Sequence, residues 1–272
     1  MKAINNALLK EFCFNDFEFY ARAKHIYQFL DANEHDIILE VGCGSMAHSK
    51  NILKLFRPTL LVGLDKNKEY ISENIIEKAN VLHKEHPNFT FQFGEAENLP
   101  FPDKSFDKVI MVEVLEHIHD DLRALQELRR VTREALIISV PNHYPSRNTF
   151  PAHFLKFVLK RLPIILQKKY GTPVIYDEEH YTKDIIGHVR GGYNLREIQS
   201  LAKKAGLECI SHQYVYGFFC RRIINMFNVI KLSWLRAPVL QKLYFLLHRI
   251  DQLIPTEGQC LIVKLKLINY RN

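Results

Sequence analysis

The chain has 272 residues, of which 47% are hydrophobic, enough for one large core or for one core with an elaborated cap. Five scattered cysteines, odd in number and without metal-ligand spacing, argue against a disulfide-stapled secreted domain. The first residues lack the apolar core of a secretion signal, and no apolar stretch approaches the roughly 18 residues of a membrane span. We therefore expect a cytoplasmic protein that is soluble or peripheral to a membrane.

The net charge of +7 is unevenly distributed along the chain. Residues 1–142 carry 17 Lys and Arg against 22 Asp and Glu, whereas residues 143–272 carry 20 against 8. Such asymmetry favours an anionic partner for the second half, and a solvated basic surface is the simpler alternative.

The first elements that the sequence predicts are a helix and a short strand, and a glycine turn follows them. Residues 10–32 have the apolar spacing of a helix, so we expect an N-terminal helical lid over 1–35. The run at 36–41 is typical of a short buried strand, and it carries Glu40 before the turn 42–44 and a helix. Glycines let the backbone turn sharply and approach a ligand, because no Cβ interferes. Ligands of open α/β sheets bind at this carboxyl end of the strands.

Strand and helix patterns alternate through the rest of the first half. Further strands are expected at 60–65, 89–93, 108–112 and 135–140, with helices that end before Pro58 and Pro87 and a third helix capped by Asp120. This alternation predicts an α/β fold with a parallel sheet that is covered on both faces.

Acidic residues stand at the ends of four successive apolar runs. They are Glu40, Asp65, Glu95 and Glu113. Carboxylates would therefore line one edge of the sheet, although strand ends are often simply polar. Asp65 lies 23 residues after Gly42, where an acid hydrogen-bonds ribose hydroxyls in nucleotide-binding βαβ units.

Five motifs in order resemble a class I S-adenosylmethionine-dependent methyltransferase. They are Glu40-Val41-Gly42-Cys43-Gly44, Leu64-Asp65, the run 94–101, Phe106-Asp107-Lys108-Val109-Ile110 and Glu113-Val114-Leu115-Glu116-His117-Ile118. The chain is most similar to the branch that includes ubiquinone, menaquinone and sugar or lipid methyltransferases. The resemblance covers about 36–143, resumes at 188–216, and implies a Rossmann-like, doubly wound seven-stranded sheet, mostly parallel with an antiparallel last strand.

The resemblance implies S-adenosylmethionine as the cofactor, with a role for each matching residue. Gly42 and Gly44 would hold the methionine part of the cofactor, with Glu40 near its ammonium group. Asp65 would accept both ribose hydroxyls, and Lys66 would line that pocket.

The remaining cofactor contacts come from the third and fourth strands. Glu95 and Ala96 would meet the adenine edge, and Glu113 would wall the cofactor near the reacting methyl group. The family usually has an Asp in place of Glu95 and a third glycine in place of Met46. We therefore expect the Met46 side chain to point away from the cofactor or the loop to differ locally.

Methyl transfer needs little from the protein, because the sulfonium already activates the methyl group and alignment supplies much of the rate. Oxygen or carbon acceptors must also lose a proton, usually to a histidine or a carboxylate. His117 and His143 follow strands at the acceptor side and are the candidate bases, with a purely structural role as the alternative. His117 and His119 lack a third ligand with supporting spacing, so we expect no metal.

The residues directly after the fourth strand narrow the acceptor class. Methyltransferases that act on amino groups of nucleobases resemble one another in an Asn/Asp-Pro-Pro-aromatic run there, whereas this chain has Glu113-Val114-Leu115-Glu116. The sequence also lacks an arginine-rich or aromatic RNA-binding signature. We therefore expect no nucleic-acid partner.

Two insertions in the cofactor-binding domain 36–272 combine apolar and basic residues, at about 144–190 and 218–256. Basic amphipathic helices can lie in an anionic membrane interface, and more often they pack on their own domain as a cap. Either role suits a small-molecule, sugar or lipid-linked acceptor. Between the insertions, Asn194 with Glu197 predicts a capping box for a helix at 195–205.

Two alternatives remain open from the sequence alone. The turn at 42–47 also satisfies Gly-x-Gly-x-x-Ala with Asp65 at dinucleotide spacing, which would suit an NAD(P)-dependent oxidoreductase. A cofactor-binding or membrane-adaptor protein without turnover is the other alternative, because methyl transfer demands no single catalytic residue.

Overall fold

The computed structural model describes residues 17–66, 72–142 and 188–215, with shorter pieces at 217, 246–247, 249–251, 253, 258 and 260–268. Most of both insertions, and His143, lie outside these described residues. Among the helices described, none combines the length and the apolar character that crossing a membrane requires.

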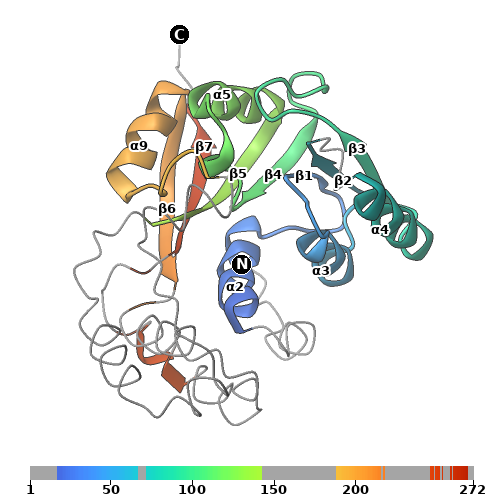
Figure 1. The fold of residues 1–272 in the computed structure, drawn as a ribbon, viewed down its shortest axis with the longest axis horizontal. Helices are drawn as coiled ribbons and strands as arrows, with labels where there is room; N and C mark the ends of the chain where they lie inside the picture. The colour runs from blue at the N-terminus through green and yellow to red at the C-terminus, as the bar shows by residue number, and fades with distance from the viewer. Residues whose placement is uncertain are drawn as a thin grey trace, which may run out of the picture.

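Seven strands form one twisted sheet. They are β1 (Ile37–Val41), β2 (Leu60–Asp65), β3 (Phe89–Phe93), β4 (Phe106–Val112), β5 (Thr132–Pro141), β6 (Leu207–Val215) and β7 (Cys260–Leu267). Their order is β3-β2-β1-β4-β5-β7-β6 (Figure 1). β7 runs antiparallel to both β5 and β6, while the other neighbours are parallel. The expected seven-stranded sheet with an antiparallel last strand is confirmed.

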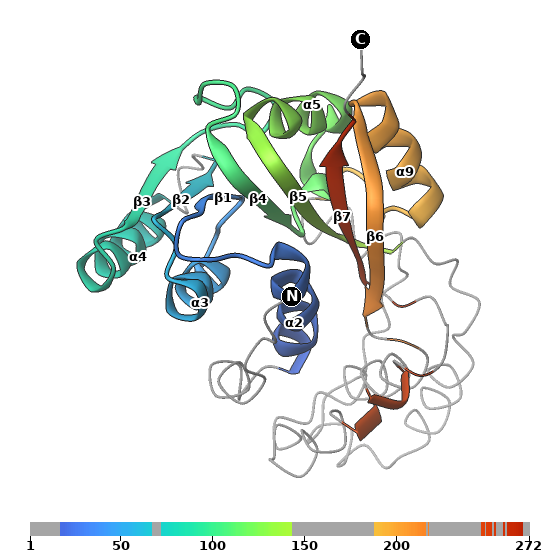
Figure 2. The same cartoon turned by 180° about the vertical axis from the view of Figure 1, so that it is seen from behind.

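Helices cover both faces of the sheet, as a doubly wound fold requires. They are α2 (Phe17–Leu30), α3 (Ala47–Phe56) and α4 (Ser72–Glu85) on one face, and α5 (Asp121–Val131) and α9 (Leu195–Lys204) on the other (Figures 1 and 2). Ile38 packs in the core on the side of α2, α3 and α4, and its neighbour Leu39 packs on the side of α5 and α9. Both residues are fully buried. A strand that is buried on both faces has a continuous apolar run, and for this reason β1 could be predicted from the sequence.

The helix ends follow the signals in the sequence. The Asp120 carboxylate accepts the Arg123 amide at 2.9 Å, and so caps α5. Asn194 and Glu197 form the predicted capping box at the start of α9. Gly206 ends α9 with φ of +77°, in the left-handed region that favours glycine.

Two strands are longer than the sequence indicated. β4 begins at Phe106 and β5 at Thr132, and these two residues pair with each other before a register shift leads into the regular ladder. Such an irregularity breaks the apolar pattern locally, so the pattern alone placed both strands two or three residues late.

Candidate cofactor and acceptor site

The glycine turn after β1 is fixed on one side and open on the other. Gly42 has φ of +74°, and a Cβ there would lie 2.2 Å from Cγ2 of Val114, so only glycine fits. The Gly42 and Cys43 amides donate to the Leu64 carbonyl at 2.8 and 3.1 Å, which ties the turn to β2. Gly44 has φ of +46°, and its Cβ would meet nothing within 4 Å. The turn therefore offers its backbone to a ligand at Gly44.

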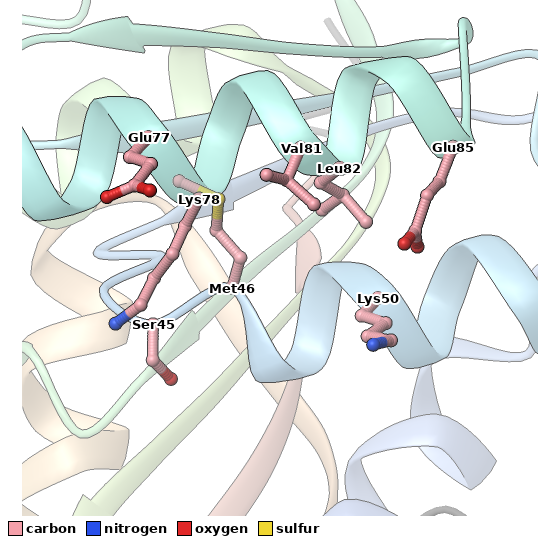
Figure 3. Close-up of a pocket in the computed structure, with 8 residues that line it drawn as sticks. All are labelled: Ser45, Met46, Lys50, Glu77, Lys78, Val81, Leu82 and Glu85. Atoms are coloured by element: carbon pink, nitrogen blue, oxygen red, sulfur yellow. The ribbon is translucent and has the colours of Figure 1, made fainter.

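Met46 stands where the family usually has a third glycine. It adopts the left-handed conformation, with φ of 62°, immediately before α3. Its side chain is almost fully buried and points toward α4, where it lines the groove between α3 and α4 (Figure 3). Met46 therefore adopts a backbone conformation that favours glycine, and its side chain packs between the two helices.

Glu40 is buried behind the turn, with 2% of the residue exposed. The Ser49 hydroxyl of α3 donates to its carboxylate. Burial raises the pKa of Glu40 to about 8; the Ser49 hydrogen bond opposes this rise, and the charge of Asp65 adds to it. The carboxyl group is therefore positioned to lose a proton when a cation arrives beside it.

Asp65 connects the end of β2 to the glycine turn. One of its oxygens accepts the Gly44 amide at 2.6 Å, and the other accepts the Lys66 amide at 2.7 Å. Each carboxylate oxygen keeps a further lone pair for hydroxyl donors. Lys66 in turn forms an ion pair of 3.1 Å with Glu95, and about half of each side chain is exposed. Ala96 beside Glu95 is buried.

Glu113 lies apart from the other three acids, although it also follows the carboxyl end of its strand. Its φ of +53° breaks the alternation of β4 and turns the side chain toward α2. There its carboxylate pairs with Arg22 at 3.2 Å and accepts the Ser139 hydroxyl at 2.5 Å. Of the four strand-end acids, Glu40 and Asp65 therefore lie at the glycine turn, Glu95 pairs with the adjacent Lys66, and Glu113 faces α2.

A second cluster lies just beyond β4, in and beside the short 3-10 helix η1 (Leu115–His117). The rings of His117 and His188 meet edge to face with centroids 4.5 Å apart. A carboxylate oxygen of Glu116 lies 4.0 Å from Nε2 of His117. Burial, and then the charge of Glu113, raise the pKa of Glu116 to about 8. No individual role for Glu116 or His188 follows from the sequence, although the resemblance to the family resumes at position 188.

Arg190 holds the two halves of this cluster together. Its guanidinium forms an ion pair with Asp121 and donates to the carbonyls of Ile118 and His119 at 3.0 Å each. The Val189 amide donates to the Glu116 carbonyl at 3.0 Å. These bonds fix the segment 188–190 against η1, although the two are more than 70 residues apart in sequence.

Comparison with known proteins identifies the domain. Residues 39–138 match the family described as Methyltransferase domain. An uncharacterized methyltransferase of Schizosaccharomyces pombe is 37% identical over 101 residues, 36% of each chain. A fatty-acid O-methyltransferase of Mycolicibacterium smegmatis is 36% identical over 99 residues, 35% of this chain and 33% of that one. The matched region thus spans about a third of these two relatives.

A more distant relative matches over a longer region. The chloroplastic 2-phytyl-1,4-beta-naphthoquinone methyltransferase of Arabidopsis thaliana is 24% identical over 196 residues, which are 72% of this chain and 73% of that one. The similarity therefore extends beyond the first five strands.

Solved structures with low sequence identity share the fold. An S-adenosylmethionine-dependent methyltransferase from Mesorhizobium loti has a TM-score of 0.53 at 12% identity, covering 89% of this chain and 95% of its own. The [4+2]-cyclase SpnF has a TM-score of 0.58 at 14% identity, covering 91% and 81%. Such likeness shows fold alone, because one fold hosts several chemistries. The sequence match places residues 39–138 in the Methyltransferase domain family, and the order and directions of the strands are those of the Rossmann-like methyltransferase fold.

Proposed function

We propose that this protein transfers the methyl group of S-adenosylmethionine to an oxygen or carbon atom of a small-molecule, sugar or lipid-linked acceptor. The observation that carries the proposal is the turn at Gly44, which is open toward solvent and held by the Asp65 carboxylate. The names of the relatives agree with this acceptor range, since they include a fatty-acid and a naphthoquinone methyltransferase.

The described residues fit the cofactor in three places. The methionine part would lie over Gly42 and Gly44, with its ammonium group near the buried Glu40. The ribose would bind Asp65 beside Lys66. The adenine would lie near Glu95 and Ala96.

The bound cofactor supplies a methyl group that its sulfonium has already activated, so the protein has mainly to bind and align. Asp65 is already oriented by the two amides that it accepts, so binding requires little further ordering of this side chain. Glu113 and His117 are placed at the neighbouring carboxyl end of β4, where we place the acceptor. We propose that His117 assists the loss of the acceptor proton, with His143 as a second candidate outside the described residues.

We also propose that α2 and the two insertions cover the acceptor. α2 packs against the core and its Arg22 pairs with Glu113, which supports the lid role that we propose for the segment 1–35. We further propose that the insertions at about 144–190 and 218–256 cap the acceptor. Contact of these insertions with an anionic membrane is a separate expectation, which sedimentation with vesicles of anionic or neutral lipid would test.

Calorimetry tests the cofactor. The full chain should bind S-adenosylhomocysteine and not NADH, and Asp65→Asn should weaken that binding by roughly tenfold, since a charge-assisted bond to the ribose is lost. Glu85→Gln, on the outer part of α4, is the matched control and should bind as the wild type does. Binding of NADH in place of the homocysteine would instead support the oxidoreductase.

Turnover is tested separately with methyl-labelled donor and extracts of lipids and of small metabolites. Transfer of label into either extract supports the enzyme. Tight binding of the donor with no transfer into any extract would support the non-catalytic alternative.

A further inference from the structure

We propose that Glu116, His117 and His188 form a binding site for a divalent first-row transition-metal ion just beyond the carboxyl end of β4, where we place the acceptor. One ligand atom from each of the three side chains lies within 4.8 Å of the other two. Two histidines and one carboxylate are a ligand set that suits Zn²⁺, Fe²⁺ or Co²⁺. Ligand atoms around such an ion lie roughly 3 to 4 Å apart, so small side-chain rotations would close the site.

A second observation is that two buried polar atoms of this cluster have no hydrogen-bond partner among the described residues. Glu116 is only 1% exposed, and its Oε2 has no hydrogen-bond partner among the described residues. Nδ1 of His188 is likewise buried without a partner in that part of the structure. Buried polar atoms are nearly always paired, because an unpaired one loses its water without compensation. A cation between these side chains would satisfy a carboxylate oxygen and an imidazole nitrogen at once.

The backbone around the cluster is already held in place. Val189 is bonded to the Glu116 carbonyl, and Arg190 is bonded to two carbonyls of the segment 118–119. His188 is therefore fixed next to η1 before any ion binds. A site whose ligands are positioned in advance loses less entropy on binding than one assembled from mobile loops.

The ion would act on the acceptor, and this part of the inference rests on the proposed function. Three protein ligands leave a coordination position open, which an acceptor hydroxyl can occupy. Coordination lowers the pKa of that hydroxyl, so its proton passes to water. The oxygen then forms a bond to the methyl carbon, and the electron pair of the broken carbon–sulfur bond stays on sulfur. His117 assists proton loss in this scheme as a ligand of the ion.

Metal titration of the tag-free full chain tests the site without any methyl acceptor. After removal of metal with a chelator, Zn²⁺ should bind with one-to-one stoichiometry by calorimetry, and Co²⁺ should give the absorption bands of nitrogen and oxygen coordination. His188→Ala and Glu116→Gln should each weaken Zn²⁺ binding by about tenfold or more. His119→Ala is the matched control, because that exposed side chain lies in the same loop outside the cluster.

Folding and cofactor binding are checked on the same samples. The variants should keep the circular dichroism spectrum and the S-adenosylhomocysteine affinity of the wild type, and Zn²⁺ should raise the Tm of the wild type but not of His188→Ala. Wild-type affinity for Zn²⁺ in both variants, or no binding by a folded wild type, would overturn the inference. Zn²⁺ binding without any binding of the homocysteine would leave the metal site standing and overturn the proposed function instead.

Discussion

The proposed cofactor end and the proposed acceptor end of the site are built in different ways. The cofactor end is assembled from β1, β2, β3 and the short turns after them, and its main contacts join the ends of neighbouring strands. The acceptor end joins η1 to a segment that arrives after an insertion of about 50 residues, and its central carboxylate is buried. The proposed cofactor end therefore depends on local backbone geometry, whereas the proposed acceptor end depends on packing between distant segments.

The largest expected effect at the cofactor end concerns Glu40 and pH. Its pKa is raised to about 8 in the folded chain, whereas in the unfolded chain it titrates near 4.5. The folded state therefore binds the proton more tightly, and the stability that this gives is complete below pH 4.5 and is lost as the pH rises to about 8. Relative to Glu40→Gln, the free energy of unfolding of the wild type should fall by several kcal/mol as the pH rises across this range.

Urea unfolding at intervals from about pH 4.5 to about pH 8.5 measures this difference. A wild-type profile parallel to that of Glu40→Gln would contradict the raised pKa. Calorimetry near pH 7, in buffers of different ionisation enthalpy, adds a second readout. Binding of S-adenosylhomocysteine to the wild type should release a proton, because the ammonium group of the ligand favours the charged form of Glu40.

Gly42→Ala should destabilise the protein by about 3 kcal/mol, because its Cβ would overlap Val114 and the backbone has a positive φ. Gly44→Ala is the matched variant: its Cβ meets nothing, so the stability loss should stay near about 1 kcal/mol, from backbone strain alone. Thermal unfolding measures both losses. Equal losses in the two variants would show that contact with Val114 does not restrict position 42.

Arg190→Ala should cost about 2 kcal/mol of stability, since it removes the ion pair with Asp121 and leaves the carbonyls of Ile118 and His119 without this donor. Zn²⁺ affinity should also fall, because His188 is then no longer held against η1. Affinity for S-adenosylhomocysteine should stay within twofold of wild type. A large loss of cofactor affinity would mean that the two ends of the site are coupled.

Lys66→Ala should have the smallest effect on stability, under about 1 kcal/mol, because its ion pair with Glu95 is half exposed and screened by water. Any larger consequence should appear in cofactor affinity, measured by calorimetry at low salt and at about 0.5 M salt. Lys84→Ala, in the last turn of α4, is a control for the loss of one positive charge.

The sheet, the glycine turn and the acids around it could be predicted from the amino-acid sequence. Each of the first strands is largely an apolar run, and each acid stands at or just after the end of such a run, so both can be recognised from neighbouring positions. Parallel strands then bring their carboxyl ends to one edge, where Asp65 accepts the Gly44 amide and Glu95 pairs with Lys66.

The acceptor end, by contrast, is defined by the folded chain. The left-handed backbone of Glu113 turns its carboxylate to Arg22, and neither residue indicates this pairing in the sequence. Local spacing indicated no third ligand beside His117, because His188 lies 71 residues later. Local patterns carry no information about which distant segment will pack against a given turn, since that choice is made by the whole core and by single long-range bonds such as those of Arg190.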